Sequence, residues 1–261
     1  MKIYSWNMLF RNRELDRAFA FIRDADFDIF CLQEVPEAFL ERLKTLSVSI
    51  ASAPETDRIY KGERSTQYAV ILSRFPIARE GRLPLPYRDL YFLRRGQLFT
   101  RLMLALHLWA KGVGDRHALY ADLETPHGTI RTFGLHLSLT HPAWRLEELE
   151  HVLAERDLSR PAIVCGDFNI VEQPHISILN WFLGGSPSDT LLWRRERTHI
   201  EKRFVEHELQ NPLRGSATHP LSRSQLDHIL VSNSFSVRNA SVIPDRYGSD
   251  HHPIRVETMD K

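Results

Sequence analysis

Short apolar runs alternate with amphipathic segments along most of the chain. Residues 3–8 and 28–34 are apolar runs of strand length. Between them, residues 13–24 place apolar side chains at the i, i+3, i+4, i+7 positions that form one face of a helix. Further strands are expected at residues 67–73, 101–109, 119–124, 130–138, 162–165, 226–231, 236–243 and 253–257, and further helices from Pro36 and over residues 144–155. Because strand and helix signals alternate, the pattern predicts an α/β fold.

Three long stretches lack this periodicity. They cover residues 53–65, 83–97 and 184–223, and they are polar and rich in proline, glycine or charge. Irregular segments of this length usually serve a function or are mobile. We interpret them as surface insertions on one domain that spans residues 1–261.

Composition excludes several classes of protein. The chain has 261 residues, of which 43% are hydrophobic and 26% charged, which is ordinary for a globular protein and unlike a disordered, collagen-like or coiled-coil chain. Its 34 Lys and Arg residues nearly balance 33 Asp and Glu residues, so a strongly basic nucleic-acid coat protein is disfavoured, although a local basic face stays open. Cys31 and Cys165 lie inside apolar runs, and we expect both to be buried and reduced.

Sequence patterns also favour a cytoplasmic protein without a membrane span. No uninterrupted apolar stretch reaches the roughly 20 residues that a transmembrane helix needs. The first residues, MKIYSWNML, lack the apolar core and the small-residue cleavage site of a signal peptide. We therefore expect a soluble protein that is not exported.

Four short motifs place polar side chains where an apolar strand ends. They are SWN at residues 5–7, LQE at 32–34, GDFN at 166–169 and SDHHP at 249–253. Binding sites collect at strand ends in α/β sheets. The motifs offer oxygen and nitrogen ligands without a pair of thiolates, which favours Mg²⁺, or else Mn²⁺, over zinc. Taken singly, each motif also fits a simpler interpretation, such as a tight turn for GDFN or a solvated charge for Glu34.

Seven segments in order resemble the endonuclease/exonuclease/phosphatase superfamily, which has the DNase I-like fold. The segments are SWN, LQEV, ILSRFPI, GLHLS, GDFN, QLDHILVS and SDHHPI, and the resemblance extends over residues 3–253. The resemblance implies a four-layered α/β sandwich, with two packed mixed β-sheets flanked by helices.

The resemblance also implies roles for particular residues. By their positions in the motifs, the metal-binding group comprises Asn7, Glu34 and Asp250, and the catalytic group comprises His136, Asp167, Asn169, Asp227 and His251. Asp167 and Asn169 match the pair that orients the attacking water and holds the phosphate. His251 matches the catalytic histidine and Asp227 its carboxylate partner, while His136 matches a donor to a phosphate oxygen. Whether Asp167 or His251 activates the water stays open at this point.

One position departs from the DNase I branch. There, a glutamate on an early strand pairs with the histidine that matches His136. The nearest position in this chain is around Gln67, which is neutral, and we expect Gln67 to bond the phosphate or His136.

These features together predict a metal-dependent phosphodiesterase that uses an activated water for in-line attack, with nucleic acid as the expected substrate. Residues 87–101 combine four arginines with aromatic side chains, and residues 194–204 also carry a local charge of +3. Interleaved basic and aromatic residues suit a phosphate backbone and stacked bases. The alternatives are a phosphodiesterase or phosphatase for lipid or small-molecule esters, resembling the sphingomyelinases, and a catalytically silent binding module on the same fold.

Overall fold

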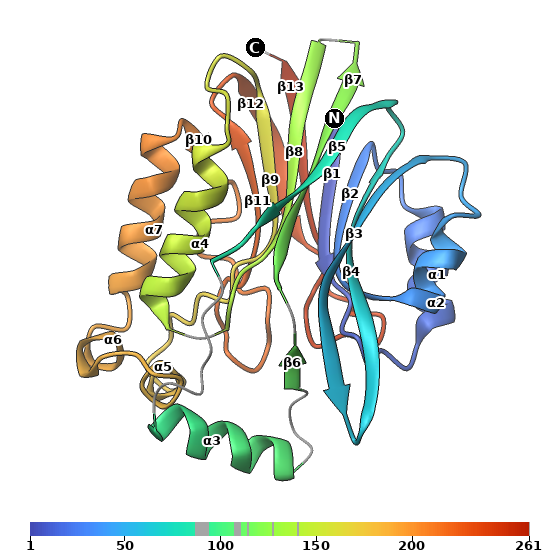
Figure 1. The fold of residues 1–261 in the computed structure, drawn as a ribbon. Coiled ribbons are helices and arrows are strands. Elements are labelled where there is room, and N and C mark those ends of the chain that lie inside the picture. The colour runs from blue at the N-terminus through green and yellow to red at the C-terminus, as the bar shows by residue number, and fades with distance from the viewer. Residues whose placement is uncertain (87–93, 107–110, 114, 127, 140, 261) are drawn as a thin grey trace.

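Two β-sheets packed face to face form the centre of the protein (Figure 1). The computed structural model describes residues 1–86, 94–106, 111–113, 115–126, 128–139 and 141–260. In spatial order, the first sheet contains β12 (Phe235–Val242), β13 (Ile254–Asp260), β1 (Lys2–Asn7), β2 (Ile29–Pro36), β4 (Glu63–Ser73), β3 (Ser49–Tyr60) and β6 (Lys111–Val113). The second contains β10 (Leu209–Gln210), β11 (Asp227–Ser232), β9 (Ala162–Asp167), β8 (Gly128–His136), β7 (His117–Thr125) and β5 (Ile77–Pro84). Both sheets are mixed, since β1 and β2 are parallel, as are β8 and β9, whereas the other neighbouring strands are antiparallel.

Helices cover the outer faces of both sheets, which confirms the predicted four-layered sandwich (Figure 1). On the first sheet lie α1 (Leu15–Asp24) and α2 (Glu37–Leu43), and on the second lie α4 (Pro142–Ala154) and α7 (Arg195–Glu206). At one end of the molecule lie α3 (Arg94–Ala105), α5 (Ile178–Phe182) and α6 (Pro187–Leu191). Within the described part of the chain, no helix has both the length and the apolar character needed to cross a membrane.

Side-chain alternation explains why the central strands are apolar on both faces. In β1, Ile3 packs between the two sheets, whereas Tyr4 and Trp6 pack under the helices of the first sheet. In β9, Cys165 faces the inter-sheet core and Val164 faces the helices of the second sheet. Successive side chains point to opposite faces of a strand, so a strand between two layers must be apolar at nearly every position.

The stretch at residues 53–65, which we expected to be irregular, is instead a long β-hairpin. Tyr60 of β3 pairs with Glu63 of β4, which leaves Lys61 and Gly62 as a two-residue turn. Both turn residues have positive φ, 51° and 85°, as a type I′ hairpin turn requires.

The strand expected at residues 101–109 is also wrong, because residues 101–105 belong to α3. Residues 107–110 lie outside the described residues. Periodicity alone does not distinguish a short apolar run in a strand from one in a helix. Phe99 of α3 stacks on Phe182 of α5, with ring centroids 5.1 Å apart. This contact joins α3 to a segment that is distant in the sequence, so the local pattern does not encode it.

The region at residues 184–223, which we expected to be an irregular surface insertion, contains regular helices and a short strand. It includes α6, α7 and β10. Of residues 83–97, the first two end β5, residues 87–93 lie outside the described residues, and the last four begin α3.

Candidate active site

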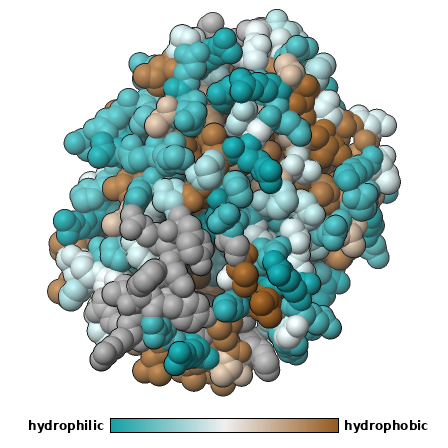
Figure 2. All heavy atoms as spheres, viewed as in Figure 1, coloured by the Kyte–Doolittle hydropathy of each residue, from teal (hydrophilic) through white to brown (hydrophobic). Residues whose placement is uncertain are grey.

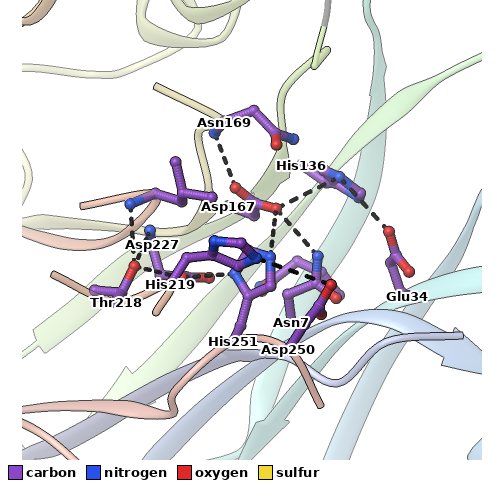
Figure 3. Close-up of polar contacts among 12 residues, drawn as sticks. Asn7, Glu34, His136, Asp167, Asn169, Thr218, His219, Asp227, Asp250 and His251 are labelled. Atoms are coloured by element: carbon purple, nitrogen blue, oxygen red, sulfur yellow. Dashed lines mark hydrogen bonds and ion pairs between the residues drawn. The ribbon is translucent and has the colours of Figure 1, made fainter. Parts of the chain in front are cut away.

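The polar residues of the motifs meet at one edge of the two sheets. Asn7 ends β1, His136 ends β8 and Asp167 ends β9, which are strand ends on the same side. Asp227 begins β11, but β11 runs antiparallel to β9, and Asp227 lies directly opposite Asp167. Strand direction therefore brings these side chains together, although they are far apart along the chain (Figure 3).

Backbone geometry of the GDFN motif aims Asp167 and Asn169 into this edge. A Cβ on Gly166 would lie 1.9 Å from the carbonyl oxygen of Leu135, so only glycine fits between β8 and β9 here. Asn169 has φ +53°, and its backbone N–H donates to Asp167 Oδ1 at 2.8 Å. The Asn169 side chain in turn donates to the Leu137 carbonyl at 2.9 Å. The turn thus holds the Asp167 carboxylate in one orientation.

Glu34 lies in a β-bulge of β2. The pairing of β2 with β4 shifts register between Leu32 and Val35, and Glu34 has φ +56°. Positive φ is costly for a residue other than glycine, and bulges often redirect side chains beside active sites. The Glu34 carboxylate accepts from the backbone N–H of Phe10 at 3.0 Å and from Arg58 Nη2 at 3.2 Å.

His251 and Asp227 form the dyad that the motifs suggested. His251 Nδ1 lies 2.8 Å from Asp227 Oδ2, and both side chains are buried. Trp6 Nε1 donates to the His251 carbonyl at 3.2 Å, and Ser249 Oγ accepts from the His251 N–H at 3.0 Å. Burial opposes the charged form of the imidazole, but the charges of Asp227 and then Asp167 raise the pKa of His251 to about 10. This raised pKa favours the doubly protonated form of the His251 ring.

His136 also has a carboxylate partner, and here the sequence interpretation was wrong. Glu55, not Gln67, bonds His136 Nδ1, while Gln67 accepts from Arg58 Nε at 3.2 Å. Glu55 is the extra residue of a β-bulge, because Pro54 pairs with Tyr68 and Thr56 pairs with Gln67. The bulge turns the Glu55 side chain inward, where it is 3% exposed.

The charges of the Glu55–His136 pair shift the titration of both groups. Burial raises the pKa of Glu55, but attraction to His136 outweighs it and lowers that pKa to about 2. Burial disfavours the charged form of His136, yet Glu55 raises the pKa of His136 above its ordinary value. Glu55 Oε2 also accepts the backbone N–H of Glu34 at 3.1 Å, so one carboxylate links His136 to the bulge of β2.

Three side chains face a shared space around Asp167. Asp167 Oδ2 lies 3.7 Å from His136 Nε2 and 3.8 Å from His251 Nε2, and His136 Nε2 lies 4.0 Å from Glu34 Oε1 (Figure 3). These separations exceed hydrogen-bond length. A water beside the pair could donate to Asp167 and accept from a ring Nε2–H, whereas a phosphoryl oxygen could accept from the Nε2–H groups of the two histidines.

Asn7 and Asp250 border the same site from different sides. Asn7 Nδ2 donates to Asp167 Oδ2 at 3.1 Å, and Asn7 Oδ1 accepts from the Leu9 N–H at 3.1 Å. Asp250 has a side chain that is 51% exposed and lies 4.0 Å from His219 Nε2. His219 was not singled out in the sequence, because no motif surrounds it and its proximity to His251 depends on the fold.

The chemistry of these donors fits a hard divalent cation. Oxygen donors at the site come from Glu34, Asp167, Asp250 and Asn7, whereas both cysteines are buried. Carboxylate and amide oxygens are preferred ligands of Mg²⁺ and Mn²⁺. Among the described residues, two groups also bring histidine and carboxylate atoms within 4.8 Å of one another, namely His219 with Asp250 and His251, and Asp167 with Asp227 and His251.

Solved structures share this fold over nearly their whole length. A mannosyl-6-phosphatase from Bacteroides thetaiotaomicron is 20% identical, with a TM-score of 0.65, and the match covers 99% of each chain. An endonuclease/exonuclease/phosphatase family protein from Leptotrichia buccalis is 14% identical, with a TM-score of 0.67 and 99% of each chain covered. The 3′ phosphatase NExo from Neisseria, bound to a product DNA hairpin, is 17% identical, with a TM-score of 0.60 and 99% of each chain covered. At these identities the likeness establishes the fold alone.

Sequence comparison establishes the family. A search of curated proteins finds no match. The model of the Endonuclease/Exonuclease/phosphatase family matches residues 4–251, a span that contains SWN, LQE, GDFN and the first three residues of SDHHP. Members of the family are phosphoester hydrolases that generally use divalent metals, in agreement with the oxygen-rich site described above. The chain therefore belongs to the endonuclease/exonuclease/phosphatase family of phosphoesterases.

Proposed function

We propose that this protein is a divalent-metal-dependent phosphodiesterase that hydrolyses nucleic acid by in-line attack of an activated water. The observation that carries the proposal is the shared space between Asp167, His136 and His251, whose facing atoms lie 3.7–3.8 Å apart. Phosphoester hydrolysis needs an oriented water, neutralisation of charge on the phosphoryl oxygens and protonation of the leaving oxygen.

Asp167 is suited to orient the attacking water. Its carboxylate is fixed by Asn169 and Asn7, and an ionised carboxylate only accepts hydrogen bonds. A water that donates to Asp167 therefore presents its lone pair toward a phosphorus atom in the shared space.

Both histidines are suited to donate rather than accept. In each ring Nδ1 faces a carboxylate, and the raised pKa of His136 and of His251, about 10 for the latter, favours the doubly protonated form. Nε2–H of each ring then faces the shared space. This supports His251 as the residue that stabilises the developing charge and Asp167 as the residue that handles the water.

Glu34, with Asn7 and Asp250, would hold the metal ion. A divalent cation bound there supplies Lewis-acid neutralisation of phosphoryl charge. Hydrogen bonds from Arg58 and from the Phe10 N–H hold the Glu34 carboxylate in one position.

A basic and aromatic wall beside Glu34 favours nucleic acid. The wall consists of Phe10, Arg11 and Tyr60, and the Arg11 guanidinium lies 4.4 Å from the Tyr60 ring centroid and 5.3 Å from that of Phe10. Aromatic faces stack on bases, and arginines attract phosphates. The Neisseria 3′ phosphatase with its DNA hairpin gives the proposal further support.

The two basic stretches noted in the sequence contribute differently. Residues 87–93 lie outside the described residues. In the stretch at 194–204, Arg197 bonds Glu172 at 2.7 Å and Arg203 bonds Glu150 at 2.7 Å. Those two arginines are used in ion pairs, so the wall of Phe10, Arg11 and Tyr60 is the better candidate for strand binding.

Nicking of supercoiled plasmid, and degradation of single-stranded DNA and RNA, in Mg²⁺ and in EDTA test the proposal. We expect cleavage in Mg²⁺ that EDTA abolishes and that His251→Ala loses. His252→Ala is the matched control, because His252 Nδ1 donates instead to the Ile243 carbonyl at 3.0 Å. Glu34→Ala should raise the Mg²⁺ concentration needed for half-maximal rate. Absence of turnover on every phosphoester would contradict the proposal and favour a binding module.

One observation favours a second candidate, a phosphodiesterase for lipid esters. Leu98, Leu102 and Leu106 occupy one side of α3 and its C-terminal end, and they are 75%, 52% and 56% exposed. Figure 2 shows hydrophobic side chains at the lower end of the molecule, where Figure 1 places α3. An exposed apolar stripe on a helix suits a lipid surface. Hydrolysis of a phospholipid in vesicles without cleavage of nucleic acid would select this candidate.

A further inference from the structure

His219 lies beside the catalytic histidine, although none of the sequence motifs includes it. Its ring packs against that of His251, with centroids 4.9 Å apart and planes at 61°. The side chain is 13% exposed, so it borders the site and still reaches its surface. The backbone is fixed by bridging to Ser224, and Thr218 next to it bonds Asp227.

Contacts of His219 Nδ1 define which ring nitrogen carries the proton. The backbone N–H of Ser222 donates to Nδ1 at 3.1 Å, and the Ser222 hydroxyl lies 3.0 Å from the same atom. A nitrogen that accepts from a backbone N–H has no proton of its own, so the neutral ring carries its proton on Nε2.

The Nε2–H of His219 is available to a ligand. Asp250 Oδ2 lies 4.0 Å from Nε2, beyond hydrogen-bond length, and among the described residues Nε2 has no hydrogen-bond partner. A metal ion at Nε2 would need the other tautomer, which the Ser222 N–H opposes. The geometry therefore favours donation over metal ligation.

We propose that His219 is a specificity-determining residue whose Nε2–H donates to an acceptor oxygen on the sugar next to the scissile phosphate of a nucleotide substrate. The inference rests on the proposed function, because it assumes that the ester bound beside His251 is part of a nucleic acid. An Nε2–H donor at this point would distinguish a sugar ester, which has ring and hydroxyl oxygens, from an ester without them.

Calorimetric binding of thymidine 5′-monophosphate in Mg²⁺ tests this directly. His219→Phe keeps a ring but removes the donor, and we expect the Kd to rise roughly fivefold to tenfold. His219→Gln places an amide N–H near the position of Nε2 and should restore the Kd to within about twofold of the wild type. His252→Phe is the control for a ring change at a neighbouring histidine and should leave the Kd unchanged.

Turnover of two diesters separates a substrate contact from a packing role. We expect His219→Phe to raise KM for thymidine 5′-(4-nitrophenyl) phosphate severalfold more than KM for bis(4-nitrophenyl) phosphate, which has no sugar. Equal losses of kcat on both diesters, or a His219→Gln variant as impaired as His219→Phe, would show that His219 only supports His251 and would overturn the inference. Wild-type binding of the nucleotide by His219→Phe, or no binding by the wild type, would also overturn it. A wild type that binds the nucleotide but hydrolyses neither diester counts against the proposed function, while the binding data still decide the role of His219.

Discussion

Two histidine–carboxylate dyads face each other across Asp167, and they are built in opposite ways. His136 lies on the second sheet and takes its partner Glu55 from the first, whereas His251 precedes a strand of the first sheet and takes Asp227 from the second. Each ring gives Nδ1 to its carboxylate and directs Nε2 toward the same oxygen of Asp167, at 3.7 and 3.8 Å. Both dyads thus cross the sandwich and tie its layers together at the site.

The carboxylates differ in what else they hold. Glu55 accepts the backbone N–H of Glu34, so it supports the bulge that aims a candidate metal ligand. Asp227 accepts from Thr218 Oγ1 at 2.7 Å, a contact within nine residues of chain. Loss of the Glu55 dyad should therefore disturb the structure widely, whereas loss of the Asp227 dyad should act mainly on the chemistry of His251.

The largest expected effect is on the rate when the His251 ring is removed. His251→Ala should lower kcat by roughly 10²–10⁴-fold, because it removes a charged donor that faces the phosphate. Single-turnover kinetics on a cleavable oligonucleotide measure this, with His252→Ala as the control. Full turnover by His251→Ala would show that this dyad is not part of the chemistry.

Glu55→Gln should have the largest effect on stability. Glutamine offers one acceptor oxygen to two donors, His136 and the Glu34 N–H, and leaves a buried imidazole without its charge partner. Breaking a buried pair costs about 3–5 kcal/mol of unfolding free energy. Urea unfolding measures this, with Asp57→Asn on the same strand as the control, since Asp57 pairs with the exposed Arg64 and should cost under about 1 kcal/mol. If both variants lost the same unfolding free energy, the buried Glu55–His136 pair would contribute no more to stability than the exposed Asp57–Arg64 pair.

The same dyad should give the stability an acid-sensitive component. The folded-state pKa of Glu55, about 2, lies below its ordinary value of 4.5, so its stabilisation is complete above about pH 4.5 and is lost as the pH falls toward 2. The loss amounts to about 1.4 kcal/mol per pH unit in that window. The contribution of His136 to stability depends on pH in the opposite direction, because its pKa is raised in the folded state. That contribution is present below pH 6.5 and is lost as the pH rises through the folded-state pKa of His136. Urea titrations from pH 7 to 3 should show a steeper acid loss for the wild type than for Glu55→Gln, and parallel curves would contradict this assignment.

The smallest expected effect concerns the support of Asp227. Thr218→Val removes the hydroxyl that donates to Asp227 and accepts from the N–H groups of Leu226 and Asp227, each at 3.0 Å. We expect about 1–2 kcal/mol of lost stability and a severalfold lower kcat. Thr218→Ser keeps the hydroxyl and should behave as the wild type in both measurements. A Thr218→Ser variant as impaired as Thr218→Val would point to packing of the methyl group instead.

The resemblance to the family supplied both partners of one dyad but only the histidine of the other. Asp227 and His251 stand in recognisable motifs and are 24 residues apart, whereas Glu55 and His136 are 81 residues apart. Glu55 also stands in a stretch whose charged and proline residues resemble a loop more than a strand. The sequence offered Gln67 as the partner of His136. The bulge between Pro54 and Thr56 adds Glu55 to β3, and Glu55 bonds His136 instead.

The sequence by itself determined an α/β pattern with polar side chains where apolar strands end, and its resemblance to the family implied the two packed sheets. Alternation of apolar side chains and the polar strand ends are local properties, so they can be recognised before the fold is known. Tertiary structure alone decided which side chains meet there. The bulges at Glu34 and Glu55 and the packing of His219 against His251 depend on contacts between distant segments, which no local pattern encodes.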